Sequence, residues 1–312
     1  MTRSMGNGAI FVMPESLFES LHKSLPELPL LAAEPLAKHC SFRIGGPAEL
    51  LACPRNEGEL RELWLACRDL GITPRILGGG TNILAPDQGV PGIVISTRGL
   101  DALGLDEDGS ISAGAGVPLA RLAVFAQKNG LTSLEFAHGI PGTVGGGMYM
   151  NAGAYGGELA QVAVSARFLT AEGEIQTFVG EEMGLGYRRS AFMALPGVIV
   201  SARFRLEAGD PETIQARMRE LMERRRASQP LELPSAGSTF KRPVGGYAAA
   251  LIQEAGLKGF RVGDAAVSEK HAGFVVNLGS ASAADVLTLM ARVREIVKAK
   301  SGIELEPEVR IW

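Results

Sequence analysis

Two glycine-rich segments are the parts of the sequence whose residue types point first to chemistry. Residues 139–158 (GIPGTVGGGMYMNAGAYGGE) contain eight glycines and a single charged side chain. The glycines of residues 77–84 (LGGGTNIL) follow a short apolar run, and this segment carries no charge. Backbone N–H groups in turns and at helix starts bind anions without help from a cation. Together with the side chains of Thr81, Asn82 and Thr143, the two segments are therefore predicted to hold the two phosphates of one dinucleotide.

The same glycines allow other interpretations. A flexible linker is disfavoured because apolar residues such as Ile140 and Met148 stand between the glycines, whereas linkers are rich in Gly and Ser. A glycine-rich buried corner without a ligand stays open. The common nucleotide signatures are absent, since the chain has no GxxxxGK[ST] and no GxGxxG between a strand and a helix. A P-loop ATPase and a standard Rossmann dehydrogenase are therefore disfavoured.

Composition and charge narrow the class of protein further. The chain has 312 residues, of which 46% are hydrophobic, and this is enough for two or three domains with cores of their own. A formal charge of −3 provides no field for nucleic acid or an acidic membrane surface, and no apolar run is long enough to span a membrane. The three cysteines are too few and too far apart for a zinc site, so no metal is expected. We expect free thiols in a reducing cytosol.

The elements that must position the glycine segments alternate between helix and strand, which indicates an α+β or α/β protein. Helices are expected to begin at four capping signals: Asn56, Pro118, Asp210-Pro211 and Ser282. Apolar residues at helical spacing follow each of them. Strands are expected over residues 76–77, 92–96, 110–113, 161–170, 174–179, 198–206, 274–277 and 309–311.

Seven motifs occur along the chain in order: RIGGPAEL (43–50), GGGTNIL (78–84), GIPGTVGGGMYMNAGAYGGE (139–158), GYRRS (186–190), AGSTFKRP (236–243), SEKHAGFVVN (268–277) and LEPEVR (305–310). In this combination, the chain from about residue 35 to residue 312 resembles the UDP-N-acetylenolpyruvoylglucosamine reductases. These flavoenzymes make UDP-N-acetylmuramate for bacterial peptidoglycan.

The resemblance implies an α+β fold, with a two-subdomain FAD-binding module of the vanillyl-alcohol-oxidase type and a smaller α+β substrate domain. The family has a longer form, in which an extra loop places a tyrosine over the substrate, and this chain resembles the shorter form. The implied boundaries are an N-terminal extension (1–34), the FAD-binding module (35–207, subdomains about 35–97 and 98–207) and the substrate-binding domain (208–312).

The resemblance also implies the cofactors. FAD would be held non-covalently, NADPH would be the co-substrate, and the protein would act in the cytoplasm as a monomer or weak homo-oligomer. Because this family does not attach its flavin through a histidine, His39 and His138 are expected to be structural or hydrogen-bonding residues. The expected FAD contacts are Gly78, Gly79, Gly80, Thr81, Asn82, Ile83, Gly139, Ile140, Gly142, Thr143, Gly145 and Gly146.

Three residues match the family's catalytic residues. Arg188 in GYRRS would hold the enolpyruvyl carboxylate, since a guanidinium can make two parallel hydrogen bonds and keeps its charge. Hydride addition at C3 leaves negative charge in that carboxylate, which needs preorganised donors. We hypothesise that Glu308 in LEPEVR acts protonated, with a pKa raised by burial. Ser238 in AGSTFKRP would donate the proton to C2.

Each of these residues also has a purely structural interpretation. Arg188 could be an exposed loop residue, Glu308 could form an ion pair at a strand end, and Ser238 could cap a turn. A hydrolytic role for Ser238 is disfavoured because no GxSxG surrounds it. For the whole chain, a sugar or alcohol oxidase of the same fold and a flavin- or nucleotide-sugar-binding protein without turnover remain alternatives.

The residues expected to contact the substrate extend beyond the catalytic three. Tyr155 matches a family position lining the sugar-nucleotide site, and Arg225 and Gln229 could meet the UDP diphosphate, although cations at a helix C-terminus are also favoured by its dipole. Ser228 stands where the family often has a lysine, so neighbouring arginines would have to substitute. The expected substrate-binding set is Tyr155, Arg188, Arg225, Gln229, Ser238, Arg242 and Glu308.

Overall fold

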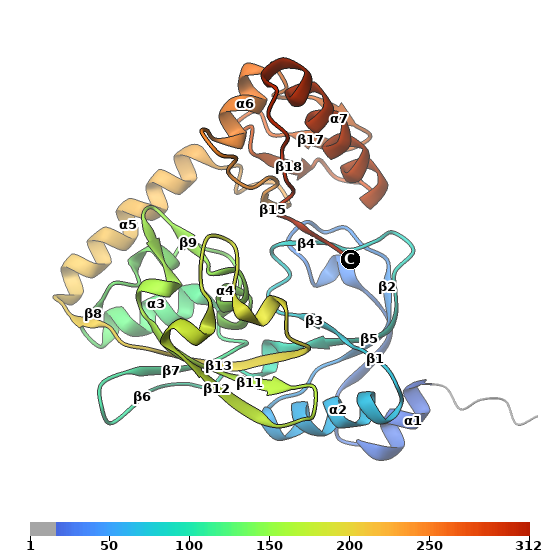
Figure 1. The fold of residues 1–312 in the computed structure, drawn as a ribbon, viewed down its shortest axis with the longest axis vertical. Coiled ribbons are helices and arrows are strands. Elements are labelled where there is room, and N and C mark those ends of the chain that lie inside the picture. Colours follow the sequence, from blue (N-terminus) through green and yellow to red (C-terminus); the bar gives the residue numbers. More distant parts are fainter. Residues whose placement is uncertain (1–16) are drawn as a thin grey trace, which may run out of the picture.

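Residues 17–312 are described by the computed structural model of the protein, so the first sixteen residues of the predicted N-terminal extension lie outside the described residues. Figure 1 shows three groups of elements, two side by side and the third above them, with the long helix α5 running from the second group towards the third. Each group is built around a sheet of four or five strands.

The first group is a four-stranded sheet whose strands follow the order β1-β2-β5-β3. Strand β1 is antiparallel to β2, and the other pairs are parallel. Helix α2 buries its apolar residues against this sheet, and its N-cap Asn56 accepts a hydrogen bond from Glu59 N at 2.9 Å, as expected. The elements are α1 (Leu17–Ser24), β1 (Leu30–Pro35), β2 (Pro47–Ala52), α2 (Glu57–Asp69), β3 (Arg75–Leu77), β4 (Ile83–Leu84) and β5 (Val90–Ser96).

The second group is an antiparallel sheet in the order β12-β11-β13-β7-β6, with α3 and α4 packed on its core. Val198 and Val200 of β13 also belong to the core beneath the first sheet, so the first two groups share buried surface. Its elements are β6 (Leu103–Leu105), β7 (Ile111–Gly114), α3 (Leu119–Lys128), β8 (Leu131–Thr132), α4 (Val144–Met150), β9 (Gly153–Ala154), β10 (Gly157–Glu158), β11 (Ala163–Thr170), β12 (Ile175–Val179), β13 (Gly197–Phe204) and β14 (Glu207–Ala208).

The third group is an antiparallel sheet in the order β15-β18-β17-β16, covered by α6 and α7. The N-cap of helix α7 is Ser282, whose hydroxyl accepts from Asp285 N at 3.0 Å, and its C-cap is Gly302, which has a φ of 72°. The elements are β15 (Ser235–Ser238), α6 (Ala248–Glu254), β16 (Arg261–Val262), β17 (Ala265–Val267), β18 (Phe274–Asn277), α7 (Ala283–Ser301) and β19 (Arg310–Ile311). Short 3₁₀ helices cover Leu36–Lys38, Thr97–Gly99, Glu135–Ala137, Leu159–Gln161, Gly180–Met183 and Ala191–Met193.

Helix α5 (Pro211–Ser228) connects the second group to the third. Its N-cap Asp210 accepts from Thr213 N at 2.8 Å, as the sequence predicts. Ile214 and Met218 are buried in the core of the second group, although the predicted substrate domain begins at residue 208. Strand β1 likewise joins the first sheet although it lies almost wholly within the predicted extension. The domain boundaries stay predictions.

Candidate active site

The two glycine segments lie against one another. Thr81 Oγ1 donates a hydrogen bond to Pro141 O at 3.1 Å, and a Cβ added at Gly79 would lie 2.8 Å from Gly142 Cα. Gly80 has a φ of 67°, and a Cβ there would lie 2.1 Å from His39 O. Only glycine allows this approach of two backbones. The structure thus joins residues 78–81 and 141–146 into one surface, called here the glycine cradle.

Thr143 is the clearest sign that the cradle holds a ligand. It is the N-cap of α4, yet its side chain makes no capping bond, and its Oγ1 is buried without a partner within residues 17–312. A buried hydroxyl normally has a hydrogen-bond partner. Gly78 and Gly146 flank it, since Cβ atoms there would lie 2.9 and 3.8 Å from Thr143 Oγ1. An unmatched hydroxyl among close-packed backbone fits the phosphate-bearing part of a dinucleotide.

The remaining expected cofactor residues lie within the cradle or lead away from it. Gly145 packs on Ala115, where its Cβ would lie 2.8 Å from the alanine Cβ. Asn82 and Ile83 lead into β4, which faces the C-terminal segment. Gly139 instead lies against α5, with a Cβ position 3.3 Å from Arg225 Cδ, while Ile140 packs on the second core.

Arg188 stands at the tip of a tight turn. Gly186 and Arg189 exchange two backbone hydrogen bonds of 3.1 Å each, and Arg188 has a φ of 53°, which is unusual for a residue with a side chain. Its Nε donates to Glu308 Oε1, so two expected catalytic residues 120 positions apart are in direct contact. The guanidinium also lies over the ring of Tyr187, 5.2 Å from the ring centre.

Glu308 belongs to a C-terminal segment that bridges the third group and the cradle. Its N–H donates to the carbonyl oxygen of Thr239, the residue after Ser238, at 2.8 Å. Its carbonyl accepts from Asn82 Nδ2 at 3.2 Å, and Arg310 N donates to Asn82 O at 2.9 Å. Strand β19 then pairs in parallel with β4, and Figure 1 shows the C-terminus beside β4. The chain therefore carries Glu308 between the expected proton donor and the expected cofactor site.

The surroundings of Glu308 favour its neutral form. Burial raises the pKa of the Glu308 carboxyl, and the charges of Arg188 and Lys241 oppose this without reversing it. The side chain is 11% exposed. Removing a carboxylate from water disfavours its charge. The direction agrees with the hypothesis that Glu308 donates a hydrogen bond.

Ser238 is the last residue of β15 and is half-buried. It is paired with Phe274 of β18, which gives it a fixed strand position instead of the turn that its structural interpretation supposed. Arg242 N, four residues further along, donates to the hydroxyl of Tyr187 at 3.0 Å. This contact ties the Arg188 turn to the segment that carries Ser238.

The residues expected to bind the UDP diphosphate include a buried positive charge that has no ion-pair partner in the described chain. Arg225 is 9% exposed and its guanidinium has no ion-pair partner within the described chain; burial lowers its pKa, against the influence of Tyr155. Gln229 Oε1, four residues later, is buried without a hydrogen-bond partner in the same part of the chain. A buried cation is costly unless an opposite charge accompanies it. Arg242 is exposed and stacks over Tyr247 at 4.5 Å.

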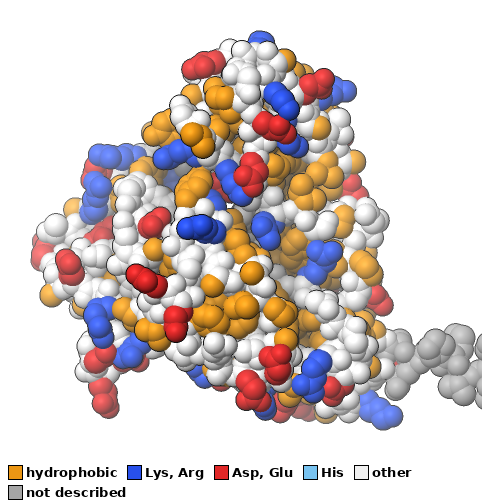
Figure 2. Space-filling model, viewed as in Figure 1, with side chains coloured by type: hydrophobic (Ala, Val, Ile, Leu, Met, Phe, Trp, Pro, Cys, Tyr) orange, Lys and Arg blue, Asp and Glu red, His pale blue; other side chains and the backbone are white. Residues whose placement is uncertain are grey.

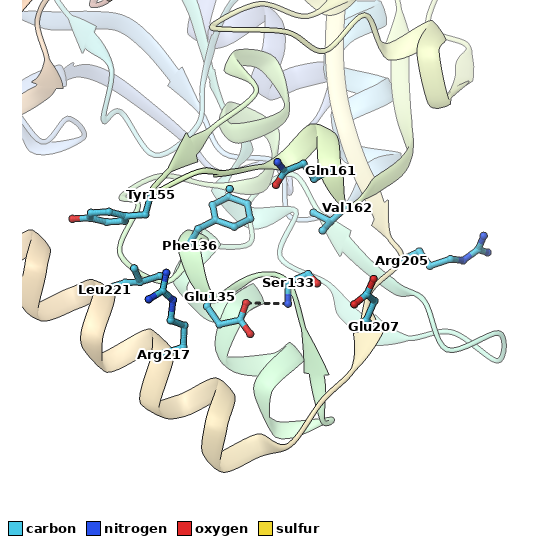
Figure 3. A pocket seen from close by; sticks show the side chains of 11 residues that line it. Ser133, Glu135, Phe136, Tyr155, Gln161, Val162, Arg205, Glu207, Arg217 and Leu221 are labelled. Carbon is cyan, nitrogen blue, oxygen red and sulfur yellow. Dashed lines mark hydrogen bonds between the residues drawn. The ribbon is translucent and has the colours of Figure 1, made fainter. Parts of the chain in front are cut away.

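Tyr155 projects from a backbone with a φ of 55° and lines a cavity of about 440 Å³ beneath α5. Figure 3 shows Arg217 and Leu221 of α5 on one wall, with Phe136 and Glu135 facing them. The lining contains none of the three expected catalytic residues. In Figure 2, Lys and Arg side chains gather where the group with α6 and α7 meets the other two, as suits an anionic ligand.

Sequence reasoning missed several residues of this site. Asn151, Tyr187 and Arg310 were assigned no contact, yet Arg310 donates to Tyr149 Oη at 3.2 Å and Tyr187 reaches Arg242. Their signal was present, because all stand inside the quoted motifs. None of the helices within residues 17–312 combines the length and apolar character needed to cross a membrane. In the same residues, no group of His, Cys, Asp or Glu side chains is arranged to hold a metal ion.

Two protein-family models match the chain. One describes an FAD binding domain and covers residues 48–178, which include both glycine segments. The other describes the C-terminal domain of UDP-N-acetylenolpyruvoylglucosamine reductase and covers residues 229–312, which include Ser238 and Glu308. These matches confirm the expected α+β fold, with an FAD-binding module followed by a smaller domain, and FAD is the cofactor.

Known proteins match over nearly the whole length. A UDP-N-acetylenolpyruvoylglucosamine reductase of Agathobacter rectalis is 47% identical over 96% of this chain and 99% of its own. One from Latilactobacillus sakei is 45% identical over 89% of this chain and 91% of its own. The crystal structure of the Thermus caldophilus enzyme is 37% identical, has a TM-score of 0.78, and covers 91% of this chain and 98% of that one. With these identities and the contact of Arg188 with Glu308 in view, the chain belongs to the UDP-N-acetylenolpyruvoylglucosamine reductase family.

Proposed function

We propose that this protein reduces UDP-N-acetylglucosamine enolpyruvate to UDP-N-acetylmuramate at the expense of NADPH, a step of bacterial peptidoglycan precursor synthesis. The observation that carries the proposal is the contact between Arg188 and Glu308, beside the glycine cradle and next to the strand of Ser238. The glycine cradle with Thr143 would hold FAD, which when bound would supply the redox chemistry that carries hydride from NADPH to the enolpyruvyl group. The protein's own residues hold the substrate and manage its charge and proton.

Arg188 binds the carboxylate of the substrate and stabilises the negative charge that develops there as C3 gains hydride. Glu308, in its neutral form, donates a hydrogen bond to the same carboxylate. Burial already raises the pKa of Glu308, and a second carboxylate at the same guanidinium raises it further. A neutral glutamic acid avoids the repulsion that an ionised one would exert on the developing charge.

Ser238 gives its hydroxyl proton to C2, so that hydride at C3 and proton at C2 together saturate the double bond. The short link from Glu308 N to Thr239 O supports this role, because it holds the strand of Ser238 beside the carboxylate-binding pair. Solvent returns the proton to Ser238 after each turnover. A positioned proton donor typically contributes about 10²–10⁴-fold to the rate.

Arg225 and Gln229 bind the UDP diphosphate, with Tyr155 close to Arg225. Arg242 is the further substrate contact. The support is the buried, unmatched guanidinium of Arg225 and the unpartnered carbonyl oxygen of Gln229. Ser228 cannot replace the phosphate contact of the lysine that the family often has at this position, because serine carries no charge and its hydroxyl donates to Arg224 O at 2.9 Å. Arg225 therefore takes over the charge that a lysine would bring to this position.

The protein acts in the cytoplasm, as a monomer or weak homo-oligomer. Three free cysteines, two of them buried, suit a reducing compartment. The rival functions are a sugar or alcohol oxidase and a binding protein without turnover. The contact of Arg188 with Glu308 favours the reductase, because neither rival requires a carboxylate clamp beside a proton donor.

The visible spectrum of the purified protein tests the proposal. Without air, NADPH should bleach the flavin absorbance, and UDP-N-acetylglucosamine enolpyruvate should then restore it. An oxidase would ignore NADPH, so its flavin absorbance would not be bleached. A binding protein would keep its reduced spectrum after the sugar nucleotide is added, and either result would refute the reductase.

A further inference from the structure

A buried asparagine links the cofactor-binding helix to the turn that carries Arg188. Asn151 is the C-cap of α4, has a φ of 45° and is 1% exposed. Its Nδ2 donates to Gly186 O at 3.1 Å, and its Oδ1 accepts from Ala160 N at 2.9 Å. Because a carbonyl only accepts and an N–H only donates, these partners fix which end of the amide faces the turn.

A second anchor fixes the other end of the same turn. Ser190 is 8% exposed, and its Oγ donates to Tyr149 O at 2.7 Å. The turn from Gly186 to Arg189 is closed by its own two backbone hydrogen bonds, so its residues form one compact piece. Both flanks of this piece are therefore tied to the C-terminal end of α4, and Arg188 is at its tip.

We propose that Asn151 is a positioning residue that sets the place of the Arg188 guanidinium relative to the glycine cradle, with Ser190 as the second anchor. The inference rests on the proposed function, in which Arg188 binds the enolpyruvyl carboxylate. Helix α4 has seven residues and is about 10 Å long, so it rigidly connects Thr143 in the cradle to Asn151. Displacing a binding group by about 1 Å can slow a reaction about 10²-fold.

Asn151→Gly separates the amide from its backbone role, because glycine keeps the left-handed conformation and removes both hydrogen bonds. The variant should retain FAD and be reduced by anaerobic NADPH at the wild-type rate. Re-oxidation by UDP-N-acetylglucosamine enolpyruvate should slow by about 10²-fold. Asn129→Gly is the matched control, since Asn129 is the exposed C-cap of α3 and bonds only within its own helix, to Phe125 O at 2.8 Å. It should leave both half-reactions unchanged.

Two readouts distinguish positioning from general support of the fold. In an Arg188→Lys background, Asn151→Gly should slow re-oxidation by less than about threefold, because the group that it positions is already lost. Equal slowing in both backgrounds would overturn the proposal. In hydrogen exchange, the peptide covering residues 184–190 should exchange faster in Asn151→Gly than in the wild type, and an unchanged rate would also overturn it.

A second variant keeps the proposal testable if the first one does not fold. If Asn151→Gly gives no folded protein, Ser190→Ala removes the other anchor and should produce the same pair of changes, slower re-oxidation and faster exchange of residues 184–190. Full activity with unchanged exchange would count against the anchoring. A wild-type protein that NADPH bleaches but the sugar nucleotide does not re-oxidise would refute the proposed function alone, and the exchange experiment would still decide the anchoring.

Discussion

Ser238, Glu308 and Arg188 are brought together by a few short backbone contacts. Glu308 N donates to the carbonyl of Thr239, and its side chain accepts from Arg188 Nε. Ser238 is therefore the neighbour in sequence of Thr239, which is hydrogen-bonded to Glu308. Changes at these side chains should separate the two half-reactions instead of unfolding the protein.

Ser238→Ala should leave the reduction of FAD by NADPH unchanged and slow the re-oxidation by the sugar nucleotide by about 10²–10⁴-fold, because only the proton transfer is lost. Stopped-flow absorbance without air measures the two steps separately. Ser235→Ala, at the other end of β15, is the control and should leave both steps near wild type. Equal slowing of both steps by Ser238→Ala would show damage to the fold instead.

Glu308→Gln should change the pH dependence of stability. Burial raises the pKa of Glu308 above its ordinary value, so its contribution to the free energy of unfolding is complete below that ordinary value and is lost as pH rises through the raised pKa. The neutral variant does not lose this stabilising contribution. Its free energy of unfolding relative to the wild type should therefore rise with pH between the ordinary pKa of a glutamate and the raised pKa of Glu308. Denaturant titrations at a series of pH values measure the difference.

Glu304→Gln is the control for this experiment. The pKa of Glu304 is lowered, chiefly by its hydrogen bond with Lys298, so its ionised form stabilises the folded protein. Removing it should lower stability relative to the wild type as pH rises through the lowered pKa, the opposite sign. If the stability of both variants relative to the wild type changed in the same direction with pH, the pKa of Glu308 would not be raised in the folded protein.

At the scale of elements, the cradle depends on glycines that have no room for a side chain. Gly80→Ala should destabilise the protein by about 1–3 kcal/mol, because it combines a positive φ with a clash against His39 O. It should also release FAD, measured as flavin absorbance per chain after gel filtration. Gly71→Ala is the matched control, with a φ of 69° and nothing within 4 Å of the new Cβ. Equal loss of FAD by both variants would contradict a specific role for the cradle.

The sequence predicted some elements and missed others for physical reasons. Helices α2, α5 and α7 were predicted because Asn56, Asp210 and Ser282 supply N-caps before long apolar repeats. Helix α4 was not expected as a helix, because glycine is a poor helix former and the sequence VGGGMYM has no apolar period. Packing of its glycines on Ala115 and Leu119 holds it instead. Strands β1 and β2 were also missed.

The candidate site was predictable as a set of residues but not as a geometry. Motif resemblance selected Arg188, Ser238 and Glu308, and the structure brings their segments together. The left-handed backbone of Arg188 and the bond from Arg242 N to Tyr187 depend on contacts between distant segments. No local pattern in the sequence encodes such contacts.

At the scale of the molecule, Tyr187 links the turn that carries Arg188 to the segment after Ser238. Tyr187→Phe removes the hydroxyl that accepts from Arg242 N but keeps the ring beneath Arg188. The loss of a hydrogen bond of about 1 kcal/mol should slow re-oxidation by the sugar nucleotide by about fivefold. Tyr247→Phe is the control, because the hydroxyl of Tyr247 makes no hydrogen bond within residues 17–312. An unchanged rate for Tyr187→Phe would show that this link does not position the site.

The contact of Arg188 with Glu308 spans 120 residues, and the cradle and the β4–β19 pair also join distant parts of the chain. Closing long loops costs entropy that is repaid only when both ends find their partners, so such contacts form late. During refolding from denaturant, the helical circular dichroism of α2, α5 and α7 should therefore return before catalytic competence does. The helices and sheets therefore form first, and the contacts that assemble the active site form last.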